Sequence, residues 1–224
     1  MTFSKHIRKS ADPIWKASHE HPFVQGIGNG SLDVEAFKYF MCQDYKYLIE
    51  YSRVIAMGSV LATDLKTMAG FAKVLDDTLN MEMDLHRSYA ERLGISREKL
   101  EATTPGPVTL AYSSYMMAEA QKGSVAELIA AILPCAWSYY EIGLELAKIP
   151  GATEHEQYGE WVRMYASDEF GDIGNWLITK LDELAEGKTE GELDRLEEIF
   201  LNTSRFEYMF WDMAYKREGW PVAG

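Results

Sequence analysis

The sequence predicts an all-α protein, a single helical bundle that spans residues 1–224. Three observations support this fold class. Apolar residues recur at helical spacing in long segments, for example Val125, Leu128 and Ile132. Serine, threonine or aspartate precedes several of these segments, as expected of helix N-caps. Alternating runs rich in valine, isoleucine and threonine, which would indicate strands, are absent from the sequence.

We expect the helices in the following order. The first covers residues 2–19, with a bend at Asp12-Pro13, and ends before His21-Pro22 because a residue before proline disfavours helix. A short turn or helix follows at 23–30. The other helices are expected at about 34–62, 65–93, 107–122, 124–148, 154–165, 168–185 and 190–217.

Several helix boundaries have identifiable causes. Asp33 caps the helix that follows it, and Gly94 ends the next one. Residues 95–107 are expected to be a connection, because Thr103-Thr-Pro-Gly-Pro107 breaks helices. The spacing of a capping box, which satisfies backbone groups at a helix start, occurs three times, at Ser124/Glu127, Thr153/Glu156 and Thr189/Glu192.

Composition and charge exclude some classes of function. The chain has 22 basic and 35 acidic residues and a net charge of -13, which disfavours binding to nucleic acid or to an anionic membrane. Two cysteines, Cys42 and Cys135, make no disulfide framework, so a cytoplasmic location is expected. The N-terminus lacks the apolar core of a signal peptide. The apolar stretch 125–147 contains acidic residues and Pro134, so it is not interpreted as a transmembrane span.

The helix at 124–148 carries the first candidate for chemistry. Pro134 lies in its middle, where the missing N–H and the ring destabilise a helix by about 3 kcal/mol and favour a kink. Cys135 follows on the apolar face, with Tyr139 one turn later. One interpretation is a tolerated kink beside a small core residue, because free cysteine is commonly buried. The other is a reactive thiol. Cys42 is expected to be buried packing.

Two carboxylates lie on faces that are otherwise apolar. Asp44 lies among Phe40, Met41, Leu48 and aromatic neighbours, and Glu207 lies on the corresponding face of the last helix. Acidic residues are rarely buried without a partner, and burial raises their pKa unless a cation or several donors hold them. No lysine or arginine lies on these faces. A structural hydrogen bond to a tyrosine hydroxyl remains an alternative to a catalytic role.

Aromatic residues accompany the thiol and the two acids. Each tyrosine alone would also fit a packed core. Together, acids, a thiol and several rings suit a flat, nitrogen-bearing heteroaromatic ligand, because rings can stack on it and carboxylates can bind its nitrogens. The aromatic candidates are Tyr47 and Tyr51 near Asp44, Tyr139 near Cys135, Phe210 and Trp211 near Glu207, and Tyr112 and Tyr165 on two other helices.

These residues carry a resemblance to a known family. The chain resembles the TenA family, the thiaminase II or aminopyrimidine aminohydrolase proteins, which have a heme-oxygenase-like all-helical fold. The similarity covers nearly the whole chain in order. The matching segments are His21-Pro-Phe23 with the glycine-rich turn, Gln43-Asp-Tyr-Lys-Tyr-Leu48, Tyr112, Pro134-Cys-Ala-Trp-Ser-Tyr139, Tyr165-Ala-Ser-Asp-Glu-Phe170 and Phe206-Glu-Tyr-Met-Phe-Trp211.

The resemblance implies roles for individual residues. It implies that Cys135 is the nucleophile, that Glu207 binds a nitrogen of a pyrimidine ring, and that Asp44 contacts the ring amino group near the thiol. The pocket-lining residues that it implies are Tyr47, Tyr112, Tyr139, Tyr165 and Phe210. One departure is visible, since an aromatic residue other than tyrosine is common in the family at position 47.

The resemblance also implies substrates and assembly. The substrate would be 4-amino-5-aminomethyl-2-methylpyrimidine or thiamin, and the product 4-amino-5-hydroxymethyl-2-methylpyrimidine. The chain would form a homotetramer and need no metal or other cofactor. Nucleic acid and membranes are not expected as partners.

Two other functions compete with this one. A di-metal oxidase of the same fold would need converging carboxylates and histidines, and Glu82-Met-Asp-Leu-His86 and His155 supply some of them. The chain has no Glu-x-x-His pair, so surface ion-pair or capping roles are expected for these residues. A non-catalytic pyrimidine-binding or regulatory protein is the second alternative. Cys135 argues against it, because a binding protein needs no nucleophile.

Overall fold

The computed structural model describes residues 1–222, which form helices and turns with no strand among them. The predicted all-α fold class is confirmed. The helices are α1 (Phe3–Ser10), α2 (Asp12–His19), α3 (Pro22–Asn29), α4 (Val34–Leu61), α5 (Leu65–Asp77), the π-helical turn η1 (Thr78–Glu82), α6 (Met83–Arg92), α7 (Arg97–Ala102), α8 (Pro107–Lys122), α9 (Val125–Leu146), α10 (Gly159–Tyr165), α11 (Asp168–Ala185) and α12 (Glu190–Lys216).

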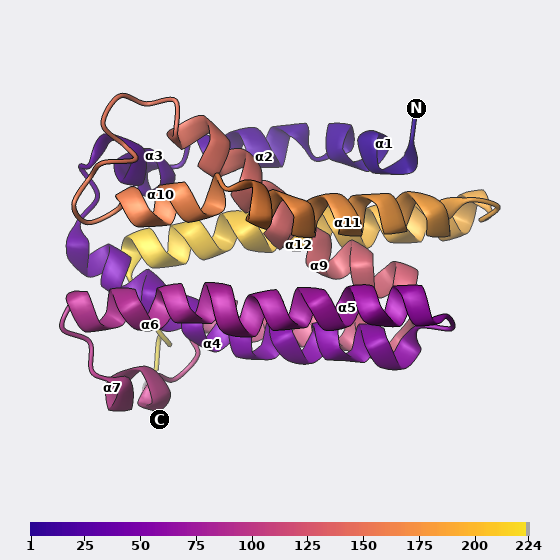
Figure 1. The fold of residues 1–224 in the computed structure, drawn as a ribbon, viewed down its shortest axis with the longest axis horizontal. Helices are drawn as coiled ribbons and strands as arrows, with labels where there is room; N and C mark the ends of the chain where they lie inside the picture. The colour runs from indigo at the N-terminus through magenta and orange to yellow at the C-terminus, as the bar shows by residue number, and fades with distance from the viewer. Residues whose placement is uncertain (223–224) are drawn as a thin grey trace.

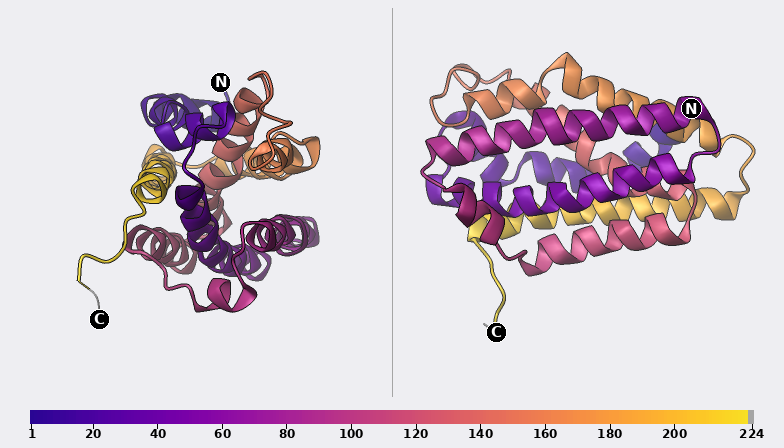
Figure 2. Two further views of the ribbon diagram at one scale, coloured as in Figure 1. Left: turned by 90° about the vertical axis from the view of Figure 1, so that its left-hand side faces the viewer. Right: turned by 60° about the horizontal axis from the view of Figure 1, so that its bottom comes forward.

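The long helices run side by side and enclose one hydrophobic core (Figures 1 and 2). In Figure 1, α5, η1 and α6 form a continuous rod in front of α4, and α11 lies in front of α12. Figure 2 shows that α11 and α12 are on different sides of the bundle, and both pack against α9. Helix α9 crosses this arrangement obliquely and packs against α4, α8, α10, α11 and α12. The central position of α9 therefore lets residues from several helices meet its side chains.

Helix α9 is a core helix. It begins at the predicted capping box, where Ser124 N donates to Glu127 Oε2 at 2.7 Å. It continues through Pro134, and the Tyr51 hydroxyl donates to the nearby carbonyl of Ile132 at 3.3 Å. Among the described residues, α9 is the one helix long and apolar enough to cross a membrane, but 78% of its apolar window is buried inside the protein.

Most of the predicted boundaries are found. The first expected helix is divided at Ala11 into α1 and α2, close to the predicted bend. Asp33 caps α4 by accepting from Glu35 N at 3.1 Å. Thr189 and Glu192 form their capping box. Gly94, with a φ of +70°, lies just after α6, where a left-handed residue commonly ends a helix.

The expected helix at 65–93 contains an irregularity that the sequence did not reveal. Its middle, η1, is a π-helical turn, in which Met83 N donates to Thr78 O, five residues earlier. A π-turn inserts one extra residue into a helix and is frequent at functional sites. It rotates the side chains of α6 relative to those of α5.

The prediction that residues 95–107 lack a helix was wrong for their first part. The short helix α7 begins there, because the Ser96 side chain accepts from Lys99 N at 3.2 Å and caps it. Leu100 is buried against the core. The breaker cluster from Thr103 acts only after this helix.

The predicted start of the helix at 154–165 was also wrong. Thr153 and Glu156 form no capping box, since the Thr153 hydroxyl bonds to Glu154 at 2.8 Å and α10 begins only at Gly159. The preceding turns are fixed by tertiary contacts instead. Tyr158 is fully buried, and its hydroxyl donates to the carbonyl of Leu32 at 2.7 Å.

Two glycines give a test of the packing of α9. A Cβ on Gly143 would lie 2.5 Å from the backbone carbon of Tyr165, whereas a Cβ on Gly174 of α11 would have its nearest neighbours at 3.9 Å. Alanine in a helix interior is more favourable than glycine by about 1 kcal/mol. We therefore expect Gly174→Ala to raise the free energy of unfolding by about 0.5–1 kcal/mol.

Gly143→Ala is expected to lower the free energy of unfolding by about 1–3 kcal/mol, because the backbone of α10 must move. Urea unfolding of both variants measures the two effects. Equal stability of the two variants would contradict the close approach of α9 and α10.

Candidate active site

Three candidate residues from three helices are buried in the centre of the bundle. Cys135 of α9 is 6% exposed, and Asp44 of α4 and Glu207 of α12 are each 3% exposed. Each lies on the inward face of its helix, as its apolar neighbours at helical spacing dictate. Two acids and a thiol in one core are unusual, because buried carboxylates are destabilising unless their oxygens are bonded.

Glu207 is anchored by a tyrosine. The Tyr112 hydroxyl donates to Glu207 Oε1 at 2.6 Å. Burial raises the pKa of Glu207 to about 8; the hydrogen bond from Tyr112 opposes this change, while the nearby acids Asp44 and Glu82 add to it. Glu207 therefore holds a proton at neutral pH and can give it to a basic atom of a ligand.

Asp44 is held by a histidine, His86, that was predicted to lie at the surface. Asp44 Oδ2 lies 2.7 Å from His86 Nε2, and His86 Nδ1 lies 2.9 Å from the carbonyl oxygen of Glu82. The expectation of a surface ion-pair or capping role for Glu82 and His86 was wrong. His86 is 0% exposed and Glu82 is 7% exposed. Asp44 thus has a hydrogen-bonding partner that can carry a positive charge, and this partner comes from a different helix.

Glu82 is a third acid at the site. The Tyr165 hydroxyl donates to Glu82 Oε1 at 2.8 Å. Burial raises the pKa of Glu82 to about 7, and the negative charge of Asp44 adds to this effect. A signal in the sequence could have found Glu82 and His86. They are four residues apart, and the buried residues Val74 and Tyr89 flank them in the same rod.

The three carboxyl groups share one arrangement. Each is held through one oxygen, Glu207 by Tyr112, Glu82 by Tyr165 and Asp44 by His86. Within residues 1–222, the second oxygen of each group makes no hydrogen bond. Three fixed carboxyl groups, each with an oxygen to spare, can bind a ligand that carries several N–H groups or basic nitrogens.

Cys135 is a thiol at rest. Burial raises its pKa well above the ordinary value, and the charges of Glu207, Glu82 and Asp44 raise it further, while the neighbouring hydroxyl of Tyr47 lowers it. These effects also show that the acids lie close to the sulfur. Forming a thiolate therefore requires a neighbouring group to take the proton.

Aromatic rings surround these polar groups. On one side, the ring of Tyr47 lies 4.9 Å from that of Tyr112 and 5.7 Å from that of Phe210, between ring centroids. On the other, the ring of Tyr139 lies 5.0 Å from that of Tyr165 and 4.8 Å from that of Trp211. All of these side chains are buried, so the structure gathers the five predicted pocket-lining aromatics in one region.

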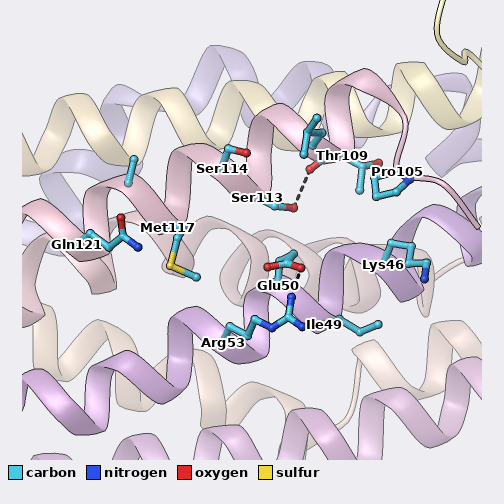
Figure 3. Close-up of a pocket in the computed structure, with 12 residues that line it drawn as sticks. Lys46, Ile49, Glu50, Arg53, Pro105, Thr109, Ser113, Ser114, Met117 and Gln121 are labelled. Atoms are coloured by element: carbon cyan, nitrogen blue, oxygen red, sulfur yellow. Dashed lines mark hydrogen bonds and ion pairs between the residues drawn. The ribbon is translucent and has the colours of Figure 1, made fainter. Parts of the chain in front are cut away.

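A surface pocket near these helices lies apart from the candidate residues. It has a volume of about 580 Å³ and lies at the surface between α4 and α8 (Figure 3). Its lining includes the charged side chains of Lys46, Glu50 and Arg53 and the polar Ser113. None of the candidate residues lines it, although Tyr47 and Tyr112 lie on the same two helices.

Within residues 1–222, no group of three or more histidine, cysteine, aspartate and glutamate side chains is arranged to hold a metal ion. His155, considered above as a metal ligand, instead stacks on Tyr158 with 4.9 Å between ring centroids.

The comparison with known proteins identifies the family. A model of the TENA/THI-4/PQQC family matches residues 8–217. The chain belongs to this family. A curated relative, named aminopyrimidine aminohydrolase, from Halalkalibacterium halodurans is 56% identical over 224 residues, and the match covers 100% of both chains.

Solved structures that are similar to this chain have the same fold. The TenA homologue from P. horikoshii OT3 is 31% identical, with a TM-score of 0.88 over 96% of this chain and 99% of that one. A domain of unknown function with a heme oxygenase-like fold from Shewanella denitrificans is 15% identical, with a TM-score of 0.76 over 95% of this chain and 92% of that one. The predicted heme-oxygenase-like fold is therefore confirmed.

The raised pKa of Glu207 predicts how stability depends on pH. In the unfolded chain this group has its ordinary pKa of 4.5, whereas in the folded protein its pKa is about 8. Between these values the folded protein holds a proton that the unfolded chain has lost. Glu207 therefore lowers the free energy of unfolding as pH rises through this interval, by at most about 1.4 kcal/mol per pH unit.

Glu207→Gln removes this contribution because the amide does not ionise. We expect the variant to gain about 2 kcal/mol or more over wild type on going from pH 5 to pH 8. Urea unfolding at both pH values measures it, with the exposed Glu156→Gln as the matched control. Parallel pH dependence of Glu207→Gln and wild type would show that Glu207 is ionised in the folded protein.

Proposed function

We propose that the chain is an aminopyrimidine aminohydrolase of thiamin salvage. It would convert 4-amino-5-aminomethyl-2-methylpyrimidine, and also thiamin, to 4-amino-5-hydroxymethyl-2-methylpyrimidine. The full-length similarity to the aminopyrimidine aminohydrolase of H. halodurans supports this activity. The observation that carries the proposal is a buried thiol, Cys135, among three carboxyl groups and a layer of aromatic rings.

The aromatic rings and carboxyl groups suit an aminopyrimidine. Tyr47, Tyr112, Tyr139, Tyr165 and Phe210 would line the pocket and pack on the flat ring. The free oxygen of Asp44 would accept a hydrogen bond from the exocyclic amine. Glu207, protonated at rest, would donate to a ring nitrogen, which makes the ring a better acceptor of electrons.

The reaction begins with addition of the thiol. Cys135 gives its proton to Asp44, and Sγ forms a bond to a ring carbon while Glu207 protonates the ring nitrogen. Because burial and the neighbouring acids raise the pKa of Cys135, this transfer has to accompany substrate binding. Glu207 cannot take the thiol proton in this step, since it already carries one.

The substituent then leaves. The bond between the exocyclic carbon and its nitrogen breaks, and the nitrogen departs with the electron pair. It leaves as ammonia after Asp44 passes it the thiol proton, or as the neutral thiazole, which needs no proton, when thiamin is the substrate. The oxygen of water adds to the exocyclic methylene carbon, and water gives its proton to a carboxylate of the site. Finally the bond between sulfur and carbon breaks, the ring nitrogen returns its proton to Glu207, and Cys135 recovers a proton from Asp44. Covalent catalysis of this kind replaces one difficult displacement with easier steps.

Several further features belong to the same proposal. The chain would act as one domain over residues 1–224 and as a homotetramer in the cytoplasm. It would act on a small-molecule substrate without a cofactor or metal, and without nucleic acid or membrane partners.

Product analysis tests the nucleophile. Wild type and Cys135→Ser are incubated with the aminomethyl pyrimidine and, separately, with thiamin, and products are separated by liquid chromatography. We expect the hydroxymethyl pyrimidine from wild type and a loss of at least about 1,000-fold in the variant, because serine is far less nucleophilic. Cys42→Ser is the matched control and should retain activity. Equal turnover by Cys135→Ser would refute covalent catalysis, and no product from folded wild type would leave a pyrimidine-binding protein.

Turnover by Glu207→Gln tests the acid. The amide can still donate a hydrogen bond but cannot transfer a proton, so kcat should fall by about 100-fold or more. Circular dichroism checks that the variant is folded. Unchanged kcat would remove the assigned role of Glu207.

A further inference from the structure

The ring of His86 is held at both of its nitrogens. Nδ1 lies 2.9 Å from the carbonyl oxygen of Glu82, and Nε2 lies 2.7 Å from Oδ2 of Asp44. A carbonyl oxygen only accepts hydrogen bonds, so Nδ1 carries a hydrogen. The short contact between Nε2 and Oδ2 also requires a hydrogen, because two lone pairs at this distance would repel. That hydrogen belongs either to an imidazolium facing a carboxylate or to a carboxylic acid facing a neutral ring.

The surroundings favour the imidazolium. Burial lowers the pKa of His86, but the hydrogen bond and the charge of Asp44 and the charge of Glu82 more than reverse this effect and raise it above the ordinary value. His19 and His21 behave in the opposite way, since burial lowers the pKa of each. His21 also has an acidic neighbour, Asp212, at 3.6 Å, but burial outweighs its effect there, whereas at His86 the two acids outweigh burial.

We propose that His86 is a positioning residue that holds Asp44 ionised and oriented, so that Asp44 can take the proton of Cys135. The inference rests on the proposed function. An isolated buried carboxyl group tends to keep its proton and could not then accept another. A positive charge on His86 would remove this difficulty for Asp44. With Oδ2 held by His86, Oδ1 remains for the thiol proton and for the amine of the pyrimidine.

The π-turn is part of this device. Glu82 ends η1 and supplies the carbonyl that fixes Nδ1, and His86 lies one turn later in α6. The same turn directs the Glu82 side chain to Tyr165. A single irregular turn thus places an acid, a hydrogen-bond acceptor and a histidine against α4 and α10.

Other titratable groups interact with the pair from four neighbouring helical segments. They are Glu82 of η1, Cys135 and Tyr139 of α9, Tyr165 of α10 and Glu207 of α12. Among the described groups near the pair, none is a lysine or arginine. His86 is thus the cation that balances Asp44.

A pair of variants separates this role from a structural one. His86→Gln keeps an N–H donor but cannot carry the positive charge. His6→Gln is the matched control, because His6 contacts Glu197 at 3.2 Å on the surface and is 51% exposed. We measure kcat/KM for the aminomethyl pyrimidine from pH 5 to pH 9, with circular dichroism to check folding.

We expect His6→Gln to match wild type. In His86→Gln, the low-pH limb of kcat/KM should move up by about one pH unit or more, since Asp44 loses the charge that favours its ionised form. The loss at pH 6 should be about 10-fold or more, and it should shrink as pH rises. An equal loss at every pH, or no loss, would overturn the inference. If wild type and His6→Gln both lack turnover, the proposed function fails instead.

Nuclear magnetic resonance of wild type tests the same point without a substitution. In protein labelled with ¹⁵N-histidine, we expect one of the five histidines to keep hydrogens on both ring nitrogens to a higher pH than the other four. Asp44→Asn should abolish that difference and so identify the residue. Five histidines that all lose the second ring hydrogen at the ordinary pH would refute the proposal.

Discussion

The site depends on burying carboxyl groups in an apolar core, where each of them needs a hydrogen-bonding partner. Glu207, Glu82 and Asp44 each solve this by one strong hydrogen bond, from a tyrosine hydroxyl or a histidine ring. A buried carboxyl group with no partner would destabilise the fold by several kcal/mol. Holding only one oxygen limits that cost and keeps the other oxygen available. The hydroxyls of Tyr112 and Tyr165 therefore stabilise the fold and also leave one oxygen of each acid free to bind a ligand.

The same arrangement gives the acids different protonation states. Burial raises the pKa of Glu207 to about 8 and that of Glu82 to about 7, whereas His86 supplies a positive charge beside Asp44. Acids of the same chemical kind thus become a proton donor and a proton acceptor within one core. Environment, rather than residue type, separates the roles.

The sequence predicted the fold and part of the site for physical reasons. Helical periodicity and capping residues located most helices, and two acids on apolar faces were visible because each interrupts a regular pattern. Glu82 and His86 continue the spacing of the buried residues Phe71, Val74 and Thr78, but they are polar. Their partners, Tyr165 and Asp44, come from other helices, so the sequence alone does not show what holds these two side chains inside the core. Tyr158 fixes the turns before α10 by its hydrogen bond to the carbonyl of Leu32. These two residues are more than a hundred positions apart in the sequence, so no local sequence pattern predicts the contact.

The length of η1 has a consequence for how this chain can vary. Each residue of a helix turns it by about 100°, so removal of one residue from Thr78–Glu82 would rotate His86 away from Asp44 while leaving its identity unchanged. Apart from Glu82, whose side chain belongs to the site, substitutions in this turn would disturb the site less than a deletion or an insertion would. The number of residues in η1 therefore matters to the proposed chemistry as much as the side chains of Glu82 and His86 do.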